Sequence, residues 1–344
     1  MRDRGTVANG TIGRWLVEIT RGALVESRHR VLAAVVTAAE GDAAPHPEAG
    51  PAVFPRSAAK PIQALPILAS GVAERYGLDE ADVALLAASH GGTPRHVERV
   101  AGILARAGAS AADLRCGIHP PLDPEAAAEL ARRGERPTPL HNNCSGQHAG
   151  FVLFARHLGV DPAGYTDLDH PVQRAVSDAL ARLTDGAPLD VGIDGCGIPA
   201  PAVPLEKLAR AFARLAGGRV DGPLAGPAAR LLAAMAACPD LVAGPGRFDT
   251  VVMEALGGRA VVKGGAEGVL CAALTATGTG IAVKAVDGTA RAAEVVMAML
   301  LARHLSGLSA PAAALLAARA APVVRNAAGM PVGEVRVTGP AAAD

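Results

Sequence analysis

The segments Val269–Thr275 (VLCAALT) and Gly280–Val286 (GIAVKAV) decide the fold of this chain. Each is a short apolar run, and Gly278-Thr279-Gly280 supplies the turn that joins them, so the pair predicts a β-hairpin. Arg259–Lys263, a little upstream, has the same apolar character and predicts another short strand. The hairpin favours a sheet that is largely antiparallel.

Strands and helices alternate along the rest of the sequence. Short apolar runs predict further strands, and these are Val31–Thr37, Val83–Ala88 and Val191–Asp194. Apolar residues recur with helical spacing in Ser57–Ala69, Arg95–Ala107, Pro124–Arg133, Ser145–Leu158, His170–Leu183, Leu205–Leu215, Pro227–Ala237 and Ala290–Leu305. Ala43–Pro51 is expected to be a loop, and Ala310–Ala321 a helix or connector.

This alternation predicts an α/β (α+β) fold, with a mixed, largely antiparallel sheet flanked by helices. No shift in composition marks a linker or a domain boundary. Residues 1–344 are therefore expected to form a single catalytic unit, and the alternative is two subdomains with the site between them.

Composition excludes several classes of protein. The formal net charge is zero and aromatic residues make up only 2% of the chain, so neither a basic footprint nor a stacking platform for nucleic acid is present. No apolar run is long enough for a membrane span, and residues 1–21 lack the apolar core of a secretory signal. The five cysteines are an odd, scattered set, typical of reduced thiols. We expect a cytoplasmic protein.

Lysine is rare, with only four residues among the 33 Lys and Arg. Arginine does not lose its proton in proteins, so a chain rich in arginine favours lysine where a neutral amine is needed. Lys60 follows Ser57 by three residues, a spacing that places both side chains on one face of a helix. The pair could act as nucleophile and base. The alternative is that Ser57 caps the helix while Lys60 is a solvated surface residue.

A second serine and a second lysine lie in glycine-rich settings. Ser89-His90-Gly91-Gly92 follows an apolar run, and its flexible backbone could supply donors for an oxyanion. Lys263-Gly264-Gly265 ends another apolar run, where an open backbone can lie against a ligand. Both runs could instead be ordinary glycine turns. The order Ser-x-x-Lys, Ser, Lys-Gly-Gly is similar to that of penicilloyl serine transferases.

Two further runs concentrate polar side chains, His141-Asn-Asn-Cys-Ser-Gly-Gln-His148 and Asp194-Gly-Cys-Gly-Ile-Pro199. Buried polar groups need partners, so such density indicates function more often than structure. Cys144 and Cys196 with a neighbouring His, Asp or Gln could bind zinc, although no Cys-x-x-Cys spacing requires it. The sequence also allows His96 to face the Ser89 loop.

Together these runs resemble the rhizobial-type L-asparaginase family, also called the asparaginase II or inducible class. The likeness extends from Val25-Glu-Ser-Arg-His29 and Arg56–Pro66 to Lys263–Gly268 and Pro322–Asn326. It implies hydrolysis of L-asparagine, with L-glutamine as a weaker or alternative substrate, on a fold similar to serine β-lactamases and glutaminases. It also implies a homodimer that binds neither nucleic acid nor membranes.

The resemblance implies two catalytic pairs, Ser57 with Lys60 and Ser89 with Lys263. Ser57 would attack the side-chain amide and form an acyl-enzyme. The substrate would be bound by Arg56, His90, Gly91, Asn143, Gln147, Asp194 and Gly264. Alternatives are a penicillin-binding or β-lactamase-like hydrolase, and a non-catalytic relative that binds zinc or an amino acid.

The resemblance also implies a zinc ion held by Cys144, Cys196 and a lysine whose position is occupied here by Gln147. A glutamine oxygen binds zinc weakly and carries no charge. We therefore expect that no cofactor is required and that zinc binding at Cys144 and Cys196 is weak or absent, unless Asp194, His148 or water completes the site.

Overall fold

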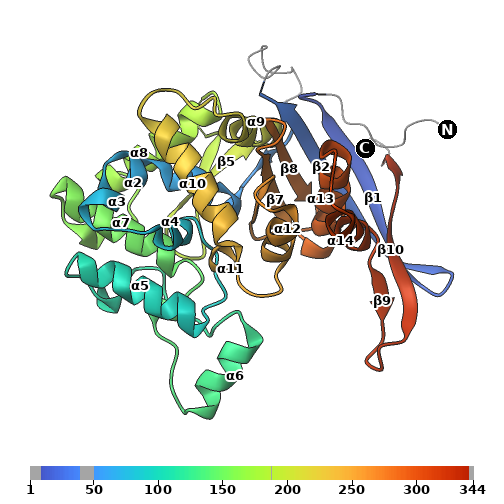
Figure 1. The fold of residues 1–344 in the computed structure, drawn as a ribbon, viewed down its shortest axis with the longest axis horizontal. Coiled ribbons are helices and arrows are strands. Elements are labelled where there is room, and N and C mark those ends of the chain that lie inside the picture. The colour runs from blue at the N-terminus through green and yellow to red at the C-terminus, as the bar shows by residue number, and fades with distance from the viewer. Residues whose placement is uncertain (1–8, 39–49, 187, 341–344) are drawn as a thin grey trace. The chain divides into compact units, whose positions relative to one another are not determined.

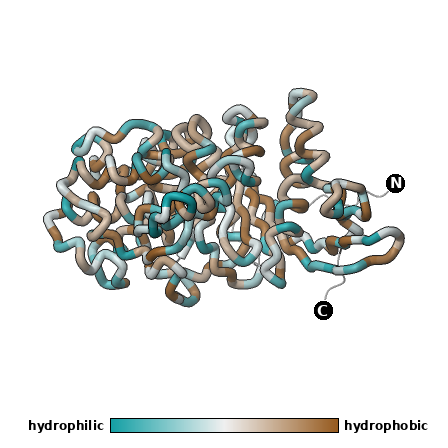
Figure 2. Tube along the Cα trace, turned by 90° about the horizontal axis from the view of Figure 1, so that it is seen from below, coloured by the Kyte–Doolittle hydropathy of each residue, from teal (hydrophilic) through white to brown (hydrophobic). Residues whose placement is uncertain are grey.

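The computed structural model describes residues 9–38, 50–186 and 188–340 (Figure 1). The chain forms two compact units. Unit 1 comprises Met1–Ala58, Val203–Arg219 and Ala255–Asp344, and unit 2 comprises Ala59–Ala202 and Val220–Glu254. Hydrophobic segments recur throughout the trace of both units (Figure 2). No helix in the described ranges is long and apolar enough to cross a membrane.

Unit 1 is built on an antiparallel sheet with the strand order β6-β7-β8-β2-β1-β10-β9 among the described residues. The bounds of these strands are β1 Ile12–Arg21, β2 Leu24–Thr37, β6 Val261–Gly264, β7 Val269–Leu274, β8 Thr279–Ala285, β9 Val323–Arg325 and β10 Pro331–Pro340. The predicted hairpin is confirmed as β7 and β8, with Cys271 opposite Ala282. The short strand β3 (Ala52–Val53) pairs with the end of β5 (Pro199–Pro204).

Helices cover both faces of this sheet. On one face, the backbone of α9 (Leu205–Ala216) lies so close to β8 that a Cβ on Gly280 would be 2.0 Å from Ala209 O. Gly280 pairs with Val36 of β2. Because side chains alternate along a strand, His29 of β2 lies on the opposite face, where it contacts residues near the start of α13 (Ala290–His304). α14 (Ala310–Ala320) packs against α13.

Unit 2 is mainly helical around α7 (Ser145–Leu158), which is buried from Ser145 to Ala155. Gly146 allows the backbone of α7 to meet the end of α4, because a Cβ there would lie 2.5 Å from Leu85 O. The other elements are α1 Lys60–Gln63, α2 Leu65–Ala69, α3 Val72–Arg75, α4 Glu80–Leu85, α5 Pro94–Arg106, α6 Pro124–Arg132, α8 Pro171–Leu183, β4 Asp190–Ile193, α10 Ala225–Ala237, α11 Pro239–Val242 and α12 Phe248–Leu256, whose end lies in unit 1.

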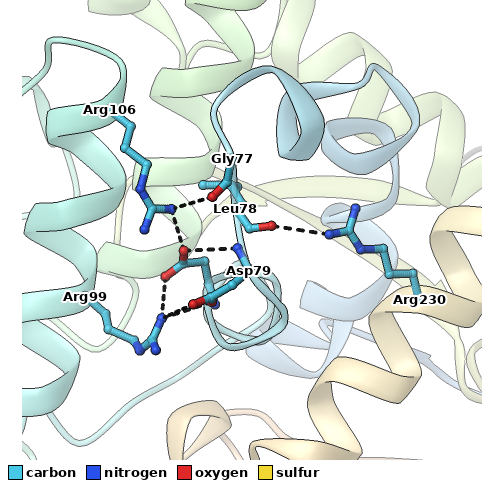
Figure 3. A network of polar contacts seen from close by, with 7 residues as sticks. Gly77, Leu78, Asp79, Arg99, Arg106 and Arg230 are labelled. Carbon is cyan, nitrogen blue, oxygen red and sulfur yellow. Dashed lines mark hydrogen bonds and ion pairs between the residues drawn. The ribbon is translucent and has the colours of Figure 1, made fainter.

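A buried carboxylate ties α4 to α5 in unit 2 (Figure 3). Asp79 and Asp82 form a capping box at the start of α4, in which Asp82 N–H donates to Asp79 Oδ1 at 2.8 Å. Asp82 is only 1% exposed, and it accepts hydrogen bonds from Arg99 (2.8 Å) and Arg106 (2.5 Å). The two arginines neutralise a charge that would otherwise be costly to bury.

Three sequence predictions about elements need correction or qualification. Val83–Ala88 is not a strand, because the capping box starts helix α4 and the chain then turns. Ser57–Ala69 is not one helix: a 3-10 turn, Arg56–Ala59, leads into two short helices, α1 and α2, each with a proline in its first turn. Most of the loop expected at Ala43–Pro51 lies outside the described residues.

Candidate active site

Ser57 lies in the 3-10 turn Arg56–Ala59, immediately before α1, and is half-buried. Arg56 has a φ of 52°, a left-handed conformation that is uncommon for a residue with a side chain. Such local strain is often found at functional sites. Lys60 begins α1 three residues after Ser57, as the sequence predicted.

Lys263 lies near the end of β6, and it is fully buried in the core of the protein. Its Nζ donates a hydrogen bond to Gly264 O at 2.7 Å. The next residue, Gly265, touches the segment that carries Ser57, since a Cβ at Gly265 would lie 2.5 Å from Pro55 O and 3.1 Å from Ala58 N. The absence of a side chain therefore brings the Lys263 loop against the Ser57 turn within unit 1.

Lys60 and the Ser89 loop come together within unit 2. Lys60 is 2% exposed and its Nζ donates to Ala88 O at 2.6 Å, directly before Ser89. Ser89 is buried, and its Oγ has no hydrogen-bond partner among the residues that the structure describes. A buried hydroxyl without a hydrogen-bond partner lowers the stability of the folded state, and nearly all buried polar groups in proteins have such a partner.

The backbone of the Ser89-His90-Gly91-Gly92 loop is largely committed to internal hydrogen bonds. Ser89 N–H donates to Val242 O and His90 N–H to Asn143 O, at 2.8 and 3.0 Å. Gly92 N–H donates to His90 Nδ1 at 3.1 Å. Among the described residues, Gly91 N–H is the one backbone donor of this loop without a hydrogen-bond acceptor. The sequence predicted oxyanion donors in this loop, and that role stays a prediction.

His90 holds the loop in place. Because Nδ1 accepts from Gly92, Nε2 carries the proton and donates to Ser145 Oγ at 2.9 Å. The ring of His90 stacks on His96 of α5 with 4.7 Å between centroids, so His96 does face the Ser89 loop. Burial lowers the pKa of His90 well below its usual range, and the nearby His96 and Lys60 add to this effect. His90 is therefore neutral at pH 7.

Asn143 and Asp194 occupy well-defined turns of unit 2. Asn143 N–H donates to His119 Nε2 at 3.1 Å, in addition to the hydrogen bond that its carbonyl accepts from His90. The Asp194 turn is closed by Asp194 N–H donating to Ile198 O and by Gly197 N–H donating to Asp194 O. Gly197 has a φ of 88°, which explains the glycine in this run.

Cys144 and Cys196 are buried and influence each other's pKa, and Cys144 Sγ donates a hydrogen bond to Asn143 Oδ1 at 3.5 Å. The hydrogen bond from Cys196 lowers the pKa of Cys144, and the charge of Lys60 lowers it further although burial opposes the shift. The same hydrogen bond and burial raise the pKa of Cys196.

These residues do not fit a zinc ion. No group of three His, Cys, Asp or Glu side chains in the described part of the chain is arranged to hold a metal. At the third family position, Gln147 Nε2 donates to Gln63 Oε1 at 2.6 Å, and Oε1 is buried without a partner. An amide oxygen is a weak zinc ligand. The positive charge beside Cys144 is already supplied by Lys60.

One polar arrangement escaped the sequence reasoning. Tyr165 accepts a hydrogen bond from Arg115 N–H at 2.7 Å and donates to His148 Nδ1 at 2.6 Å. His148 Nε2 is then protonated, and it is buried without a partner. The sequence noted His148 in a polar run, but no pattern linked it to Tyr165, 17 residues away.

The fold and these residues define an α/β protein with buried lysines and serines around glycine-rich loops. A family model described as L-asparaginase II matches residues 17–337. The chain therefore belongs to the L-asparaginase II family, a family of amidohydrolases, as the sequence motifs indicated. Comparison with curated proteins gave no match.

Proposed function

We propose that the protein hydrolyses L-asparagine to L-aspartate and ammonia, with Ser57 as the nucleophile. Membership of the L-asparaginase II family supports the substrate class. The observation that carries the role of Ser57 is the close approach of Gly265 to Pro55 and Ala58, which sets the Lys263 loop beside the Ser57 turn. A buried lysine near a hydroxyl is a recurrent way to activate a serine.

In the proposed reaction, Ser57 Oγ attacks the side-chain amide carbon of asparagine and its proton passes to a lysine amine. The C–N bond breaks, the nitrogen takes a proton and ammonia leaves. Water then attacks the aspartyl ester, releasing L-aspartate and restoring Ser57.

Two lysines are candidates for the base, and arginine substitution separates them. Arginine keeps the positive charge but cannot act as a base at neutral pH. If Lys60 is the base, Lys60→Arg lowers kcat much more than Lys263→Arg does, and the reverse holds if Lys263 is the base. The pairing of Ser89 with Lys263 stays a prediction that the Lys263 variant also tests.

The activity is tested by ammonia release from L-asparagine, L-glutamine and a β-lactam, each with and without added zinc. We expect release from asparagine, and a loss of roughly 10³-fold or more in Ser57→Ala. The thermal unfolding midpoint of this variant should be unchanged, since Ser57 is half-buried in a turn. Normal turnover in Ser57→Ala would refute its assignment, and hydrolysis of the β-lactam alone would refute the substrate.

A further inference from the structure

A second group of catalytic residue types lies in unit 1, on β2 and near the start of α13. His29 Nδ1 is 2.5 Å from Asp287 Oδ2, and His29 Nε2 is 3.3 Å from Ser27 Oγ. This is the connectivity of a Ser-His-Asp triad, in which the carboxylate orients the imidazole and the imidazole faces the hydroxyl. Separations near 3.3 Å are common for such pairs before substrate binds.

Local backbone structure presents these side chains on one face of the sheet. Ser27 and His29 are two residues apart on β2, so their side chains point the same way. The register between β1 and β2 shifts next to Ser27, because Ile19 pairs with Ser27 and Thr20 pairs with Val25. Glu26 is thus an extra residue in a β-bulge. Bulges redirect side chains and are frequent beside active sites.

Asp287 is held in position from two sides. Its Oδ1 accepts a hydrogen bond from Thr289 N–H at 3.1 Å, and its Oδ2 faces His29. Burial alone would raise the pKa of Asp287, but the hydrogen bond from His29 and that from Thr289 lower it. The carboxylate is therefore ionised at neutral pH. It favours the tautomer with the proton on Nδ1, leaving Nε2 as an acceptor facing Ser27.

Arg291, in the first turn of α13, adds a positive charge to this group. One of its guanidinium nitrogens, Nη2, lies 3.2 Å from Ser27 Oγ and 3.2 Å from His29 Nε2. In this arrangement the guanidinium competes with Ser27 for the Nε2 lone pair. An anionic group on a substrate would pair with exposed Arg291 and leave Nε2 available to accept the serine proton.

We propose that Ser27, His29 and Asp287 form a second nucleophilic site that hydrolyses small carboxylic esters bearing an anionic group, with Arg291 as the receptor for that group. Ser27 is half-buried, and Asp287 and Arg291 are exposed, so a small substrate can reach the group from solvent. The assignment of Ser57 to asparagine hydrolysis is independent of this site.

The proposed reaction is a balanced ester hydrolysis. Ser27 Oγ forms a bond to the ester carbonyl carbon while its proton moves to His29 Nε2. The carbon–oxygen bond to the alcohol breaks, and the leaving oxygen takes the proton from Nε2. Water, deprotonated by His29, then attacks the acyl-serine and releases the carboxylic acid. The net change is ester plus water to acid plus alcohol.

The test uses two probes that differ only in the charge of the acyl group, the mono-p-nitrophenyl ester of succinic acid and p-nitrophenyl butyrate. We expect the full-length protein to prefer the succinate ester. Ser27→Ala should lower its hydrolysis by roughly 100-fold. Arg291→Gln should remove the preference for the succinate ester while hydrolysis of the butyrate ester is retained. Ammonia release from asparagine should be unchanged in both variants.

Site mapping separates a catalytic role from a structural one. After acid quenching, the succinyl group should be found on the peptide that contains Ser27, in the native protein and in Ser57→Ala alike. Ser27→Cys, which keeps a nucleophile of similar size, should also be acylated. Wild-type ester hydrolysis in a folded Ser27→Ala protein would overturn the proposal. An acyl group found only on Ser57 would overturn it as well.

Discussion

Gly265 shows how a single missing side chain shapes the candidate active site. A Cβ at this position would lie 2.5 Å from Pro55 O, and the obstructing atom is backbone and cannot rotate away. Gly265 N–H is also committed, because it donates to Val269 O at 2.7 Å. Both facts fix the distance between the Lys263 loop and the Ser57 turn.

We predict that Gly265→Ala displaces the Ser57 turn and lowers kcat/KM for asparagine by roughly 100-fold, because small errors in placement are costly in catalysis. Steady-state ammonia release measures this. The matched control is Gly226→Ala in α10, where an added Cβ would meet nothing within 4 Å. Equal activity of the two variants would show that the close approach has no catalytic importance.

At the residue scale, the sequence could indicate only those candidate site residues whose chemistry is encoded locally. Ser57 and Lys60 were found from their spacing, and Lys263 from its glycine neighbours. The contact of Gln147 with Gln63 spans 84 positions in the chain, so no local pattern could indicate it. The Ser27 and Asp287 group was missed for the same reason, since Asp287 lies 258 residues from His29.

Among the secondary-structure elements, α4 depends on charge as well as on apolar packing. The buried Asp82 carboxylate serves the capping box of α4 and also binds Arg99 and Arg106 of α5 (Figure 3). Removing this charge would leave two arginines facing a neutral group in a partly buried setting.

We predict that Asp82→Asn lowers the free energy of unfolding by about 3 kcal/mol. This loss is at the low end for breaking a buried ion pair, because Arg99 and Arg106 are about a third exposed and solvent screens their charges. Urea denaturation measures this change. Asp79→Asn is the matched control: asparagine also caps helices, and Asp79 is exposed, so its loss should stay within about 1 kcal/mol. Similar losses in both variants would contradict the importance of burial.

The same capping box explains why one element could not be predicted from apolar spacing. Val83–Ala88 is an apolar run of strand length, but Asp79 and Asp82 directly precede it at the spacing of a capping box. The capping box, which starts a helix, therefore outweighed the tendency of the apolar run to form a strand. In contrast, β7 and β8 are bounded by glycine turns and carry no competing helix signal, and their prediction is confirmed.

Across the whole molecule, three buried histidines are kept neutral. Burial lowers the pKa of His90 and His96, and burial with the nearby charge of Lys60 lowers that of His148 to about 3. In the unfolded chain each would titrate near the usual value of about 6.5. Below that pH the unfolded state therefore binds protons that the folded state does not.

The contribution of these three histidines to stability is therefore fully present above pH 6.5. It is lost as the pH falls from 6.5 toward their lower pKa values in the folded state. We predict a decrease in the free energy of unfolding between pH 6.5 and 5, approaching about 1.4 kcal/mol per pH unit for His148, with His90 and His96 adding to it in the same direction. Urea denaturation at several pH values measures the slope. His96→Gln should reduce it, and a flat profile would contradict the prediction.

The division into two units could not be seen in the sequence. Unit 1 is assembled from three separate stretches of the chain and unit 2 from two. Two of the four crossings between units fall inside helical elements, at Ala58 in a 3-10 turn and at Ala255 in α12. Neither crossing has the Pro, Gly or polar composition of a linker, so composition carries no signal for it.

The central claim is that Ser57 becomes covalently bound to the acyl part of asparagine. The most direct measurement is to mix the protein with L-asparagine, quench with acid within the first turnover, and map modified peptides by mass spectrometry. The account predicts an aspartyl ester on the peptide that contains Ser57, absent from Ser57→Ala. An aspartyl ester on Ser89, or turnover of asparagine in Ser57→Ala, would contradict it.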